Sequence, residues 1–320
     1  MKNDENKVAR GVYAAVLTPF SDRLEPDTLK FVEHCRWLLE NGCDGLAPFG
    51  TTGEGASLSA GQKIELLKAA KDAGLPMDRM IVGAGSCALE DAVAVGRAAT
   101  LYGCEGVLFL PPFYFKNPSD DGLFNYFSEL IGRVADERFR IYLYHFPKMS
   151  AVPISAHLIE RLLAAFPSTV VGLKDSSGDW SNTEMMLNKF PGFGVFSGSE
   201  EFLLDNLNAG GAGCISATTN VTAPLAQKVF QAWKASSGEI ESLQNPLSET
   251  RLMLQALPMV PMLKALKALA VRDDNWLHIS PPLDRLTYDM RQALDRMIPR
   301  LETLVAAASG LYGRVKKTDS

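Results

Sequence analysis

The stretch VVGLKDSSGDW, residues 170–180, is an apolar run that ends in a polar turn. The run predicts a buried β-strand, and Lys174 follows its apolar residues with no turn signal in between. An ammonium group at such a place either extends from the strand end into solvent or works inside a pocket. Which interpretation holds depends on the fold around this strand.

Seven further apolar or β-branched runs occur along the chain, and longer segments of helical period separate them. The eight expected strands lie within residues 12–20, 43–50, 80–85, 106–112, 141–147, 170–176, 194–200 and 213–220, and the helical stretches include residues 29–39, 64–73 and 92–102. This alternation is typical of parallel strands joined by crossover helices. Eight such units predict an α/β protein with a closed (β/α)8 TIM barrel. A doubly wound open sheet is the competing fold, but no G-x-G-x-x-G phosphate fingerprint follows the first strand.

After the last expected strand, the chain has helical spacing only. Breaks in this spacing are expected near residues 236–238, Pro258, Pro261 and residues 280–282. We therefore predict two parts, a catalytic barrel over residues 8–235 and a C-terminal helical extension over residues 236–312.

Composition and charge exclude several classes of protein. The chain has 320 residues, of which 47% are hydrophobic and 22% charged, as in ordinary globular proteins. A formal charge of -5 offers no basic field to nucleic acid, and no apolar run approaches the ~18 residues of a membrane span. The polar N-terminus has no apolar export signal, and the five cysteines include no C-x-x-C pair. These features predict a cytoplasmic protein that binds neither nucleic acid nor membrane.

In a barrel of this kind, catalytic groups lie where strands end and the following loops begin. Polar side chains at these positions are therefore candidates for function. They are Thr51, Thr52 and Glu54 after the second strand, Tyr114 after the fourth, Tyr144 and His145 at the fifth, Lys174 and Asp175 at the sixth, Ser199 and Glu200 at the seventh, and Ser216 and Thr218 at the eighth.

Lys174 is the candidate nucleophile. Apolar surroundings disfavour the charged ammonium, and a neutral amine attacks carbonyl carbon to form a Schiff base. This reaction needs a proton shuttle, and Tyr144, which shares a strand face with Tyr142 but lies nearer the strand end, offers a hydroxyl for it. The alternatives are a structural ion pair of Lys174 with Asp175 or another carboxylate, and a packing role for Tyr144 inside the barrel.

The turn in FGTTGEGASLS, residues 49–59, sets two hydroxyls between glycines directly after a strand. Free backbone N–H groups and the hydroxyls of Thr51 and Thr52 suit a small carboxylate. A purely structural glycine-rich turn is the alternative. Glu54 precedes a helix and is expected to complement the dipole of that helix.

Metal chemistry and serine hydrolysis both lack their residues. The four histidines have no H-x-H or H-E-x-x-H spacing, and only His145 falls at the end of a strand. A zinc-dependent aldol site therefore has no set of ligands. The G-x-S-x-G elbow of many serine hydrolases is also missing. We predict an enzyme that needs neither a metal nor a cofactor.

Three motifs point to a known family. GTTGE at residues 50–54, YHFP at 144–147 and GLKDSSGD at 172–179 resemble, in this order, motifs of the dihydrodipicolinate synthase and N-acetylneuraminate lyase family of class I aldolases. The resemblance extends over nearly the whole chain and implies that Lys174 forms a Schiff base with pyruvate or another 2-oxo acid. It also implies that Tyr144 relays protons.

The same resemblance implies roles for other residues. Thr51 matches the threonine that links the catalytic tyrosine to a second tyrosine. Tyr114 in PPFYFKNPS resembles this second tyrosine, which in synthase members reaches into the site of a neighbouring subunit. Thr51 and Thr52 would hold the pyruvate carboxylate, while Gly198 and Ile215 would line the pocket. A homo-oligomer, either a tetramer or a dimer, is the assembly that the family implies.

Two departures from the family pattern concern the second substrate. Synthases carry an arginine that binds the carboxylate of their aldehyde, but Met149 stands at this position in HFPKMSA. Sialic acid lyases tend to have a GYDE-like turn after the seventh strand, which Ser199 and Glu200 in SGSEEF match only in part. Together with His145, these residues are the candidate contacts to a different aldehyde.

We therefore predict a Schiff-base-forming lyase that cleaves or forms a 2-oxo-3-deoxy sugar acid or a 4-hydroxy-2-oxo acid, with pyruvate as one product or substrate. Dihydrodipicolinate synthase, and a dehydratase or deaminase of a 2-oxo acid that uses the same lysine imine, are the alternatives. A barrel that only binds a 2-oxo acid as a sensor would need to have lost the lysine or the tyrosine, and both are present.

Overall fold

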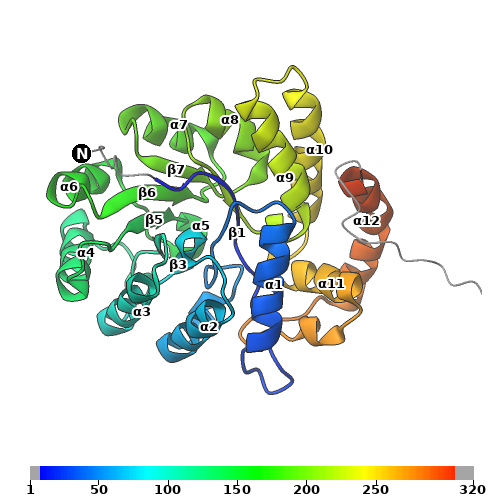
Figure 1. Ribbon diagram of the computed structural model, residues 1–320, viewed down its shortest axis with the longest axis horizontal. Helices are drawn as coiled ribbons and strands as arrows, with labels where there is room; N and C mark the ends of the chain where they lie inside the picture. Colours follow the sequence, from blue (N-terminus) through cyan, green and yellow to red (C-terminus); the bar gives the residue numbers. More distant parts are fainter. Residues whose placement is uncertain (1–7, 307–320) are drawn as a thin grey trace, which may run out of the picture.

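Eight parallel strands form the centre of the molecule, in a computed structural model that describes residues 8–306. The strands are β1 (Gly11–Ala14), β2 (Gly45–Leu46), β3 (Ile81–Gly83), β4 (Gly106–Phe109), β5 (Ile141–His145), β6 (Val170–Asp175), β7 (Gly194–Ser197) and β8 (Gly213–Ser216). They pair in the order β2-β1-β8-β7-β6-β5-β4-β3, and an isolated bridge between Leu46 and Met80 joins the two edges. The nearly closed barrel in Figure 1 confirms the predicted (β/α)8 fold.

Except for the short α5, which lies within their ring, the helices cover the outside of the barrel, as Figure 1 shows. They are α1 (Thr28–Glu40), α2 (Ala60–Asp72), α3 (Leu89–Tyr102), α4 (Asp120–Val134), α5 (Pro147–Ser150), α6 (Ala156–Ala165), α7 (Trp180–Lys189), α8 (Leu203–Asn208) and α9 (Thr219–Lys234). The three helical stretches expected from the sequence are confirmed in α1, α2 and α3. Side-chain caps begin several of the helices; in α2, Ser59 and Gln62 form a reciprocal capping box.

The strand residues alternate between two apolar clusters. Inside the barrel lie Tyr13, Ala15, Ala47, Ile81, Leu108, Tyr142, Tyr144, Val171, Phe196 and Ile215. Their neighbours along the strands, such as Leu143, Leu173 and Val195, pack outward against the helices. Because successive strand side chains point to opposite faces, this alternation decides which polar residues reach the barrel interior.

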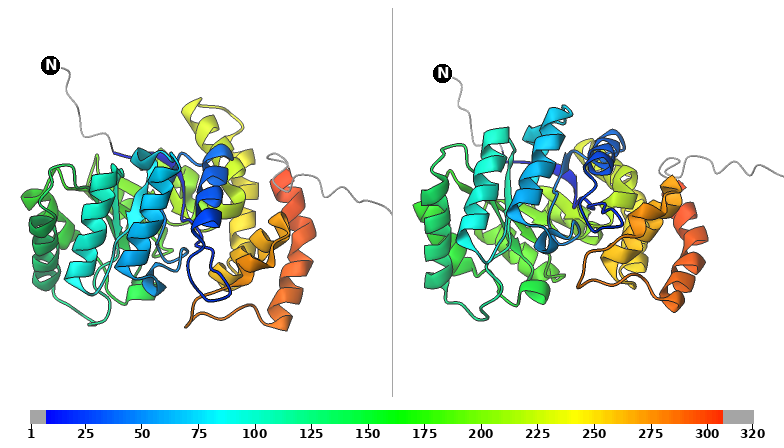
Figure 2. Two further views of the ribbon diagram at one scale, coloured as in Figure 1. Left: turned by 60° about the horizontal axis from the view of Figure 1, so that its bottom comes forward. Right: turned by 90° about the horizontal axis from the view of Figure 1, so that it is seen from below.

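Three further helices follow the barrel, α10 (Ile240–Leu254), α11 (Met259–Val271) and α12 (Tyr288–Ala306). Figures 1 and 2 show α11 and α12 on one side of the barrel. Leu263 and Leu294 pack there with Leu17 of the barrel. Breaks between helices lie near residues 236–238, Pro258 and residues 280–282, as expected, and Pro261 follows the second break in the first turn of α11, where backbone N–H groups have no partner within the helix. The boundary after residue 235 stays a prediction, and residues 307–312 of the predicted extension lie outside the described residues.

Within residues 8–306, no single helix is both long and apolar enough to cross a membrane. Only α10 and α11 taken together pass by length and composition, and they meet at a bend of 110°.

Candidate active site

Lys174 lies inside the barrel near the carboxyl end of β6. The strand register sets it between Tyr144 of β5 and Phe196 of β7, whose rings belong to the apolar cluster of the interior. Its side chain is buried, and Nζ lies 4.4 Å from the centroid of the Tyr144 ring. The side-chain nitrogen of Lys174 therefore does not extend into solvent but faces the ring of Tyr144.

Asp175 points to the other face of the same strand. Its carboxylate accepts hydrogen bonds from the Ser177 N–H at 2.8 Å, from Asn182 Nδ2 at 2.7 Å and from Thr183 Oγ1 at 2.8 Å. These donors belong to the start of α7 and the turn before it, so Asp175 holds the β6–α7 connection. Among the described residues Lys174 forms no ion pair, with Asp175 or with any other carboxylate.

The Tyr144 hydroxyl meets a threonine from a different part of the chain. Its oxygen lies 3.3 Å from Thr51 Oγ1, and its ring stacks on Phe146 with centroids 5.7 Å apart. A lysine from β6, a tyrosine from β5 and a threonine from the turn after β2 are thus brought together. A hydroxyl pair of this kind can pass a proton, and Lys174 lies against the same ring.

The turn that carries Thr51 and Thr52 is closely packed. The Glu54 N–H donates to the Thr51 carbonyl at 3.1 Å, and Thr18 Oγ1 donates to the Gly53 carbonyl at 2.7 Å. A Cβ at Gly55 would lie 1.8 Å from the Phe49 carbonyl oxygen, so only glycine fits there. Thr52 is buried in this turn, and its role in holding a carboxylate stays a prediction.

Gly198 directly follows β7, at the same end of the barrel as Lys174. Ile215 lies in the barrel interior. The Gly198 N–H donates to the Asp175 carbonyl at 2.7 Å, and a Cβ at Gly198 would lie 2.2 Å from Ser176 Oγ. The glycine thus lets the ends of β6 and β7 approach closely. Ile215 of β8 is fully buried in the same interior cluster as Tyr144.

His145 lies on the face of β5 opposite Tyr144. Its Nδ1 accepts a hydrogen bond from the Ile154 N–H at 3.1 Å, which holds the chain between α5 and α6. Burial lowers the pKa of His145, while the charge of Asp175 partly offsets this effect. The structure therefore does not bring His145 together with Lys174 and Tyr144.

The structure also places Glu200 away from the barrel interior. Its carboxylate is fully buried and accepts hydrogen bonds from Ser216, from Thr218 Oγ1 at 2.5 Å and from Thr222 Oγ1 at 2.7 Å, with Arg251 Nη1 at 3.7 Å. Both oxygens are thus occupied by the protein, so the prediction that Glu200 contacts substrate is corrected. Ser199 is also turned to its own loop, because its hydroxyl accepts from the Glu201 N–H at 3.3 Å.

Tyr114 and Met149 are the two exposed residues of the predicted set. Tyr114 is 75% exposed in the β4–α4 loop, where its ring meets that of Phe115 edge to face. Among the described contacts, neither Tyr144 nor Thr51 is its partner. Met149 is 58% exposed on α5, the short helix after β5.

Glu54 corrects another expectation and reveals a residue that the sequence analysis missed. Instead of complementing a helix dipole, its buried carboxylate forms an ion pair with Lys264 of α11. The following one-turn helix, η1 (Gly55–Ser57), has no side-chain cap. The signal for Lys264 was a lysine within an apolar helix, MVPMLKALKALAV, which is the same signal that singled out Lys174.

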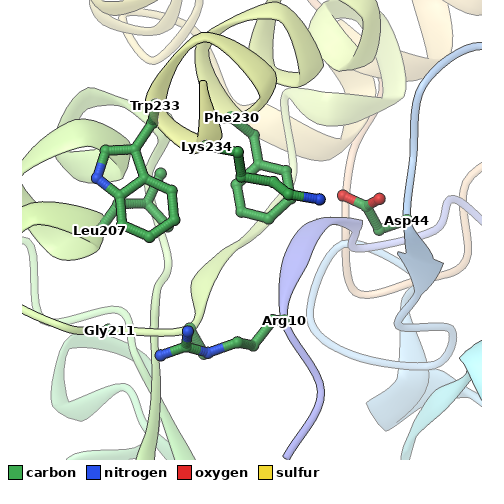
Figure 3. Close-up of a pocket in the computed structure, with 8 residues that line it drawn as sticks. Arg10, Asp44, Leu207, Gly211, Phe230, Trp233 and Lys234 are labelled. Atoms are coloured by element: carbon green, nitrogen blue, oxygen red, sulfur yellow. The ribbon is translucent and has the colours of Figure 1, made fainter. Parts of the chain in front are cut away.

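A cavity of about 260 Å³ lies elsewhere, as Figure 3 shows. Arg10, Asp44 and Ala212, which line it, stand just before β1, β2 and β8. It therefore lies at the opposite end of the barrel from the predicted site, and none of the predicted residues lines it. Catalytic groups of barrels lie at the carboxyl ends of the strands, so we place the candidate site at Lys174.

Known proteins resemble this chain over most of its length. Residues 8–301 match the dihydrodipicolinate synthetase family. An uncharacterized DapA-like lyase of Chloroflexus aurantiacus is 35% identical over 80% of this chain and 85% of its own. The 4-hydroxy-tetrahydrodipicolinate synthase of Methanopyrus kandleri is 30% identical over 92% of this chain and 97% of its own. The crystal structure of dihydrodipicolinate synthase from Agrobacterium tumefaciens is similar with a TM-score of 0.79 at 31% identity, covering 93% of this chain and 99% of that one.

Proposed function

Because the chain belongs to the dihydrodipicolinate synthetase family, and is thus a lyase of the class I aldolase type, we propose that it cleaves or forms a 2-oxo-3-deoxy sugar acid or a 4-hydroxy-2-oxo acid. Pyruvate is one product or substrate. The observation that carries this proposal is the position of Lys174, buried without a carboxylate partner among the described residues and 4.4 Å from the ring of Tyr144.

In the proposed cleavage, the imine formed on Lys174 accepts the electron pair of the broken bond. The Lys174 amine adds to the C2 carbonyl, and loss of water from the carbinolamine gives an imine. When a base takes the proton of the 4-hydroxyl, the C3–C4 bond breaks, which releases an aldehyde and leaves an enamine on Lys174. Protonation of C3 and hydrolysis of the imine then release pyruvate. No external cofactor is needed, because the imine itself accepts the electron pair.

Tyr144 is the proposed proton carrier for these steps. Its hydroxyl lies 3.3 Å from Thr51 Oγ1, so protons can pass between the two oxygens and the reacting atoms next to Lys174. Thr51 and Thr52, in the turn after β2, are proposed to hold the carboxylate of the 2-oxo acid, with Gly198 and Ile215 along the pocket wall. His145, Ser199 and Glu200 are left out of this proposal, because His145 Nδ1, the Ser199 hydroxyl and the Glu200 carboxylate accept hydrogen bonds from within the protein.

Two alternatives use the same imine. A dihydrodipicolinate synthase would condense pyruvate with aspartate semialdehyde, and the names of several relatives favour it. A dehydratase or deaminase would release water or ammonia instead of cleaving a C–C bond. A screen of 2-oxo-3-deoxy acids, read out as pyruvate and aldehyde release, separates these outcomes. We expect both products in equal amounts; a 2-oxo product with an unbroken carbon chain would favour the dehydratase.

Specificity for the aldehyde provides a sharper prediction at Met149. This thioether offers only apolar surface, whereas an arginine would bind a substrate carboxylate through two hydrogen bonds. We expect poor turnover with aspartate semialdehyde, better turnover with neutral or hydroxylated aldehydes, and a shift of kcat/KM toward the acidic aldehyde in Met149→Arg. Lys148→Arg, next to it on the same helix, is the matched control. If the unmodified enzyme prefers aspartate semialdehyde to every sugar-derived aldehyde, the synthase is the better proposal.

We also propose a cytoplasmic homo-oligomer, a tetramer or a dimer. All five cysteines lie among the described residues without a disulfide, in keeping with a reducing compartment. The adjacent rings of Tyr114 and Phe115 are 75% and 76% exposed, and a second copy of the chain would cover them. Light scattering is expected to give a multiple of the monomer mass, reduced in Phe115→Ser but not in Leu29→Ser, a control at an exposed leucine of α1. A fully active monomer would contradict this proposal.

A further inference from the structure

A buried ion pair links the C-terminal helices to the turn that carries Thr51. The Glu54 carboxylate, in that turn, pairs with Lys264 Nζ on α11, and both side chains are 0% exposed. Neither residue touches Lys174 or Tyr144 among the described contacts, and the proposed chemistry uses neither of them. A charged pair in the interior is unfavourable to separate, because each partner alone would be a buried, unpaired charge.

Glu54 and Lys264 each have further contacts besides their ion pair. The Ser280 N–H donates to Glu54 Oε2 at 2.7 Å. Lys264 Nζ donates to the His278 carbonyl at 2.7 Å and lies 4.5 Å from the centroid of the Phe20 ring. Burial lowers the pKa of Lys264, and the pair with Glu54 partly offsets this. One carboxylate thus joins the turn both to α11 and to the segment that follows it.

The backbone of the turn needs such support. Glu54 has a φ of 53°, in the left-handed region that residues with a side chain rarely adopt. Its N–H donates to the Thr51 carbonyl at 3.1 Å, and the Gly55 N–H donates to the Gly50 carbonyl at 3.0 Å. A strained residue persists only where its surroundings hold it, and here the side-chain contacts of Glu54 add to these backbone hydrogen bonds.

We propose that Glu54 and Lys264 are positioning residues, which hold the turn so that Thr51 reaches Tyr144 and the Thr51–Thr52 backbone stays ready for a carboxylate. The C-terminal helices are then a support of the active site and not a separate appendage. This inference rests on the proposed function for the identity of the substrate carboxylate, but its first test does not.

The first test measures hydrogen exchange of the backbone amides in residues 50–55. In Lys264→Met, which keeps the length of the side chain but leaves Glu54 unpaired, we expect these amides to exchange about 10-fold faster or more. Leu301→Ala is the matched control: it opens a cavity at a buried position of α12, lowers stability, and removes no contact of the turn. Should Lys264→Met not fold, Glu54→Gln removes the opposite charge with little change of shape.

The second test measures pyruvate binding. Borohydride trapping of pyruvate is expected to need about 10- to 100-fold more pyruvate for half-saturation in Lys264→Met, as for other small displacements of positioning groups, with a smaller effect on the trapping rate at saturation. Leu301→Ala should keep the wild-type half-saturation. In the double variant Glu54→Gln/Lys264→Met, the fold-change in the pyruvate concentration for half-saturation should be smaller than the product of the two single fold-changes.

The outcomes separate the two proposals. If Lys264→Met and Glu54→Gln keep wild-type exchange in residues 50–55, the positioning role is wrong, whatever the reaction is. If exchange in residues 50–55 rises equally in Leu301→Ala, the positioning role is also wrong, because a general loss of stability would explain the change. If the wild-type enzyme does not trap pyruvate at all, the proposed function fails, and the exchange measurement alone decides the role of the ion pair.

Discussion

Borohydride reduction in the presence of pyruvate is expected to attach one reduced pyruvyl group to the protein, at Lys174. This lysine alone, among those described, lies inside the barrel against a tyrosine whose hydroxyl reaches a threonine. In Lys174→Met, we expect no labelling and a loss of kcat of about 10⁴-fold or more, because the covalent step has no other nucleophile. Intact-protein and peptide mass spectra, with steady-state kinetics, provide the measurement.

Two other lysines make this prediction specific. Burial lowers the pKa of Lys63 and of Lys267 to about 8, so these two amines are partly neutral near pH 8. They lie on the outer helices α2 and α11, and Lys267 Nζ lies over the ring of Trp37. Lys267→Met should therefore label like the wild type. Labelling at Lys63 or Lys267 in place of Lys174 would mean that amine basicity, and not the barrel site, controls the reaction.

Replacement of the Tyr144 hydroxyl is expected to have the next largest effect. Tyr144→Phe keeps the ring beside Lys174 but removes the oxygen that lies 3.3 Å from Thr51 Oγ1. We expect kcat to fall by about 10²-fold or more, the usual size for a lost acid–base group, while pyruvate still forms the imine slowly. Thr51→Val should act in the same direction, but less. Steady-state rates and the time course of borohydride trapping measure the two effects separately.

Tyr142→Phe is the matched control for this experiment. Tyr142 faces the same interior from the same strand, but its hydroxyl donates to Glu105 at 3.0 Å and accepts from the Ala9 N–H at 3.1 Å, toward the amino ends of the strands. Its loss should lower the melting temperature and leave kcat within a few-fold of the wild type. If Tyr144→Phe also keeps a near wild-type kcat, its hydroxyl only packs in the barrel.

The fold was predictable from the sequence because its signals are local. Each strand is a short apolar run in the sequence, and each helix is a segment in which apolar residues recur with a period of about 3.6. Eight alternations could therefore be counted without any knowledge of contacts. The candidate catalytic pair followed from the same reasoning. Lys174 and Tyr144 both stand near strand ends, and the parallel barrel brings the carboxyl ends of its strands to one side.

Errors arose where a side chain's partner lies far along the chain, or where the side chain lies on the outer face of its strand. Glu54 precedes a helix, so a dipole role was reasonable, but α11 supplies a buried ammonium for it. Glu200 follows a strand end, yet Thr218 and Thr222 occupy its oxygens on the outer side. His145 is adjacent to Tyr144 in sequence and faces away from it, since neighbouring strand residues point to opposite faces.

The sequence by itself therefore determined the barrel, the strand-end lysine and tyrosine, and the family to which their motifs belong. Only the tertiary structure decided that α7 holds Asp175, so that Lys174 has no carboxylate partner among the described residues, that Thr51 meets Tyr144, and that Lys264 pairs with Glu54 in the turn of Thr51. The physical reason is the range of the interactions. Hydrophobic period and turn chemistry act over a few residues, whereas a buried charge or hydroxyl is satisfied by whichever group the closed barrel brings within hydrogen-bonding distance.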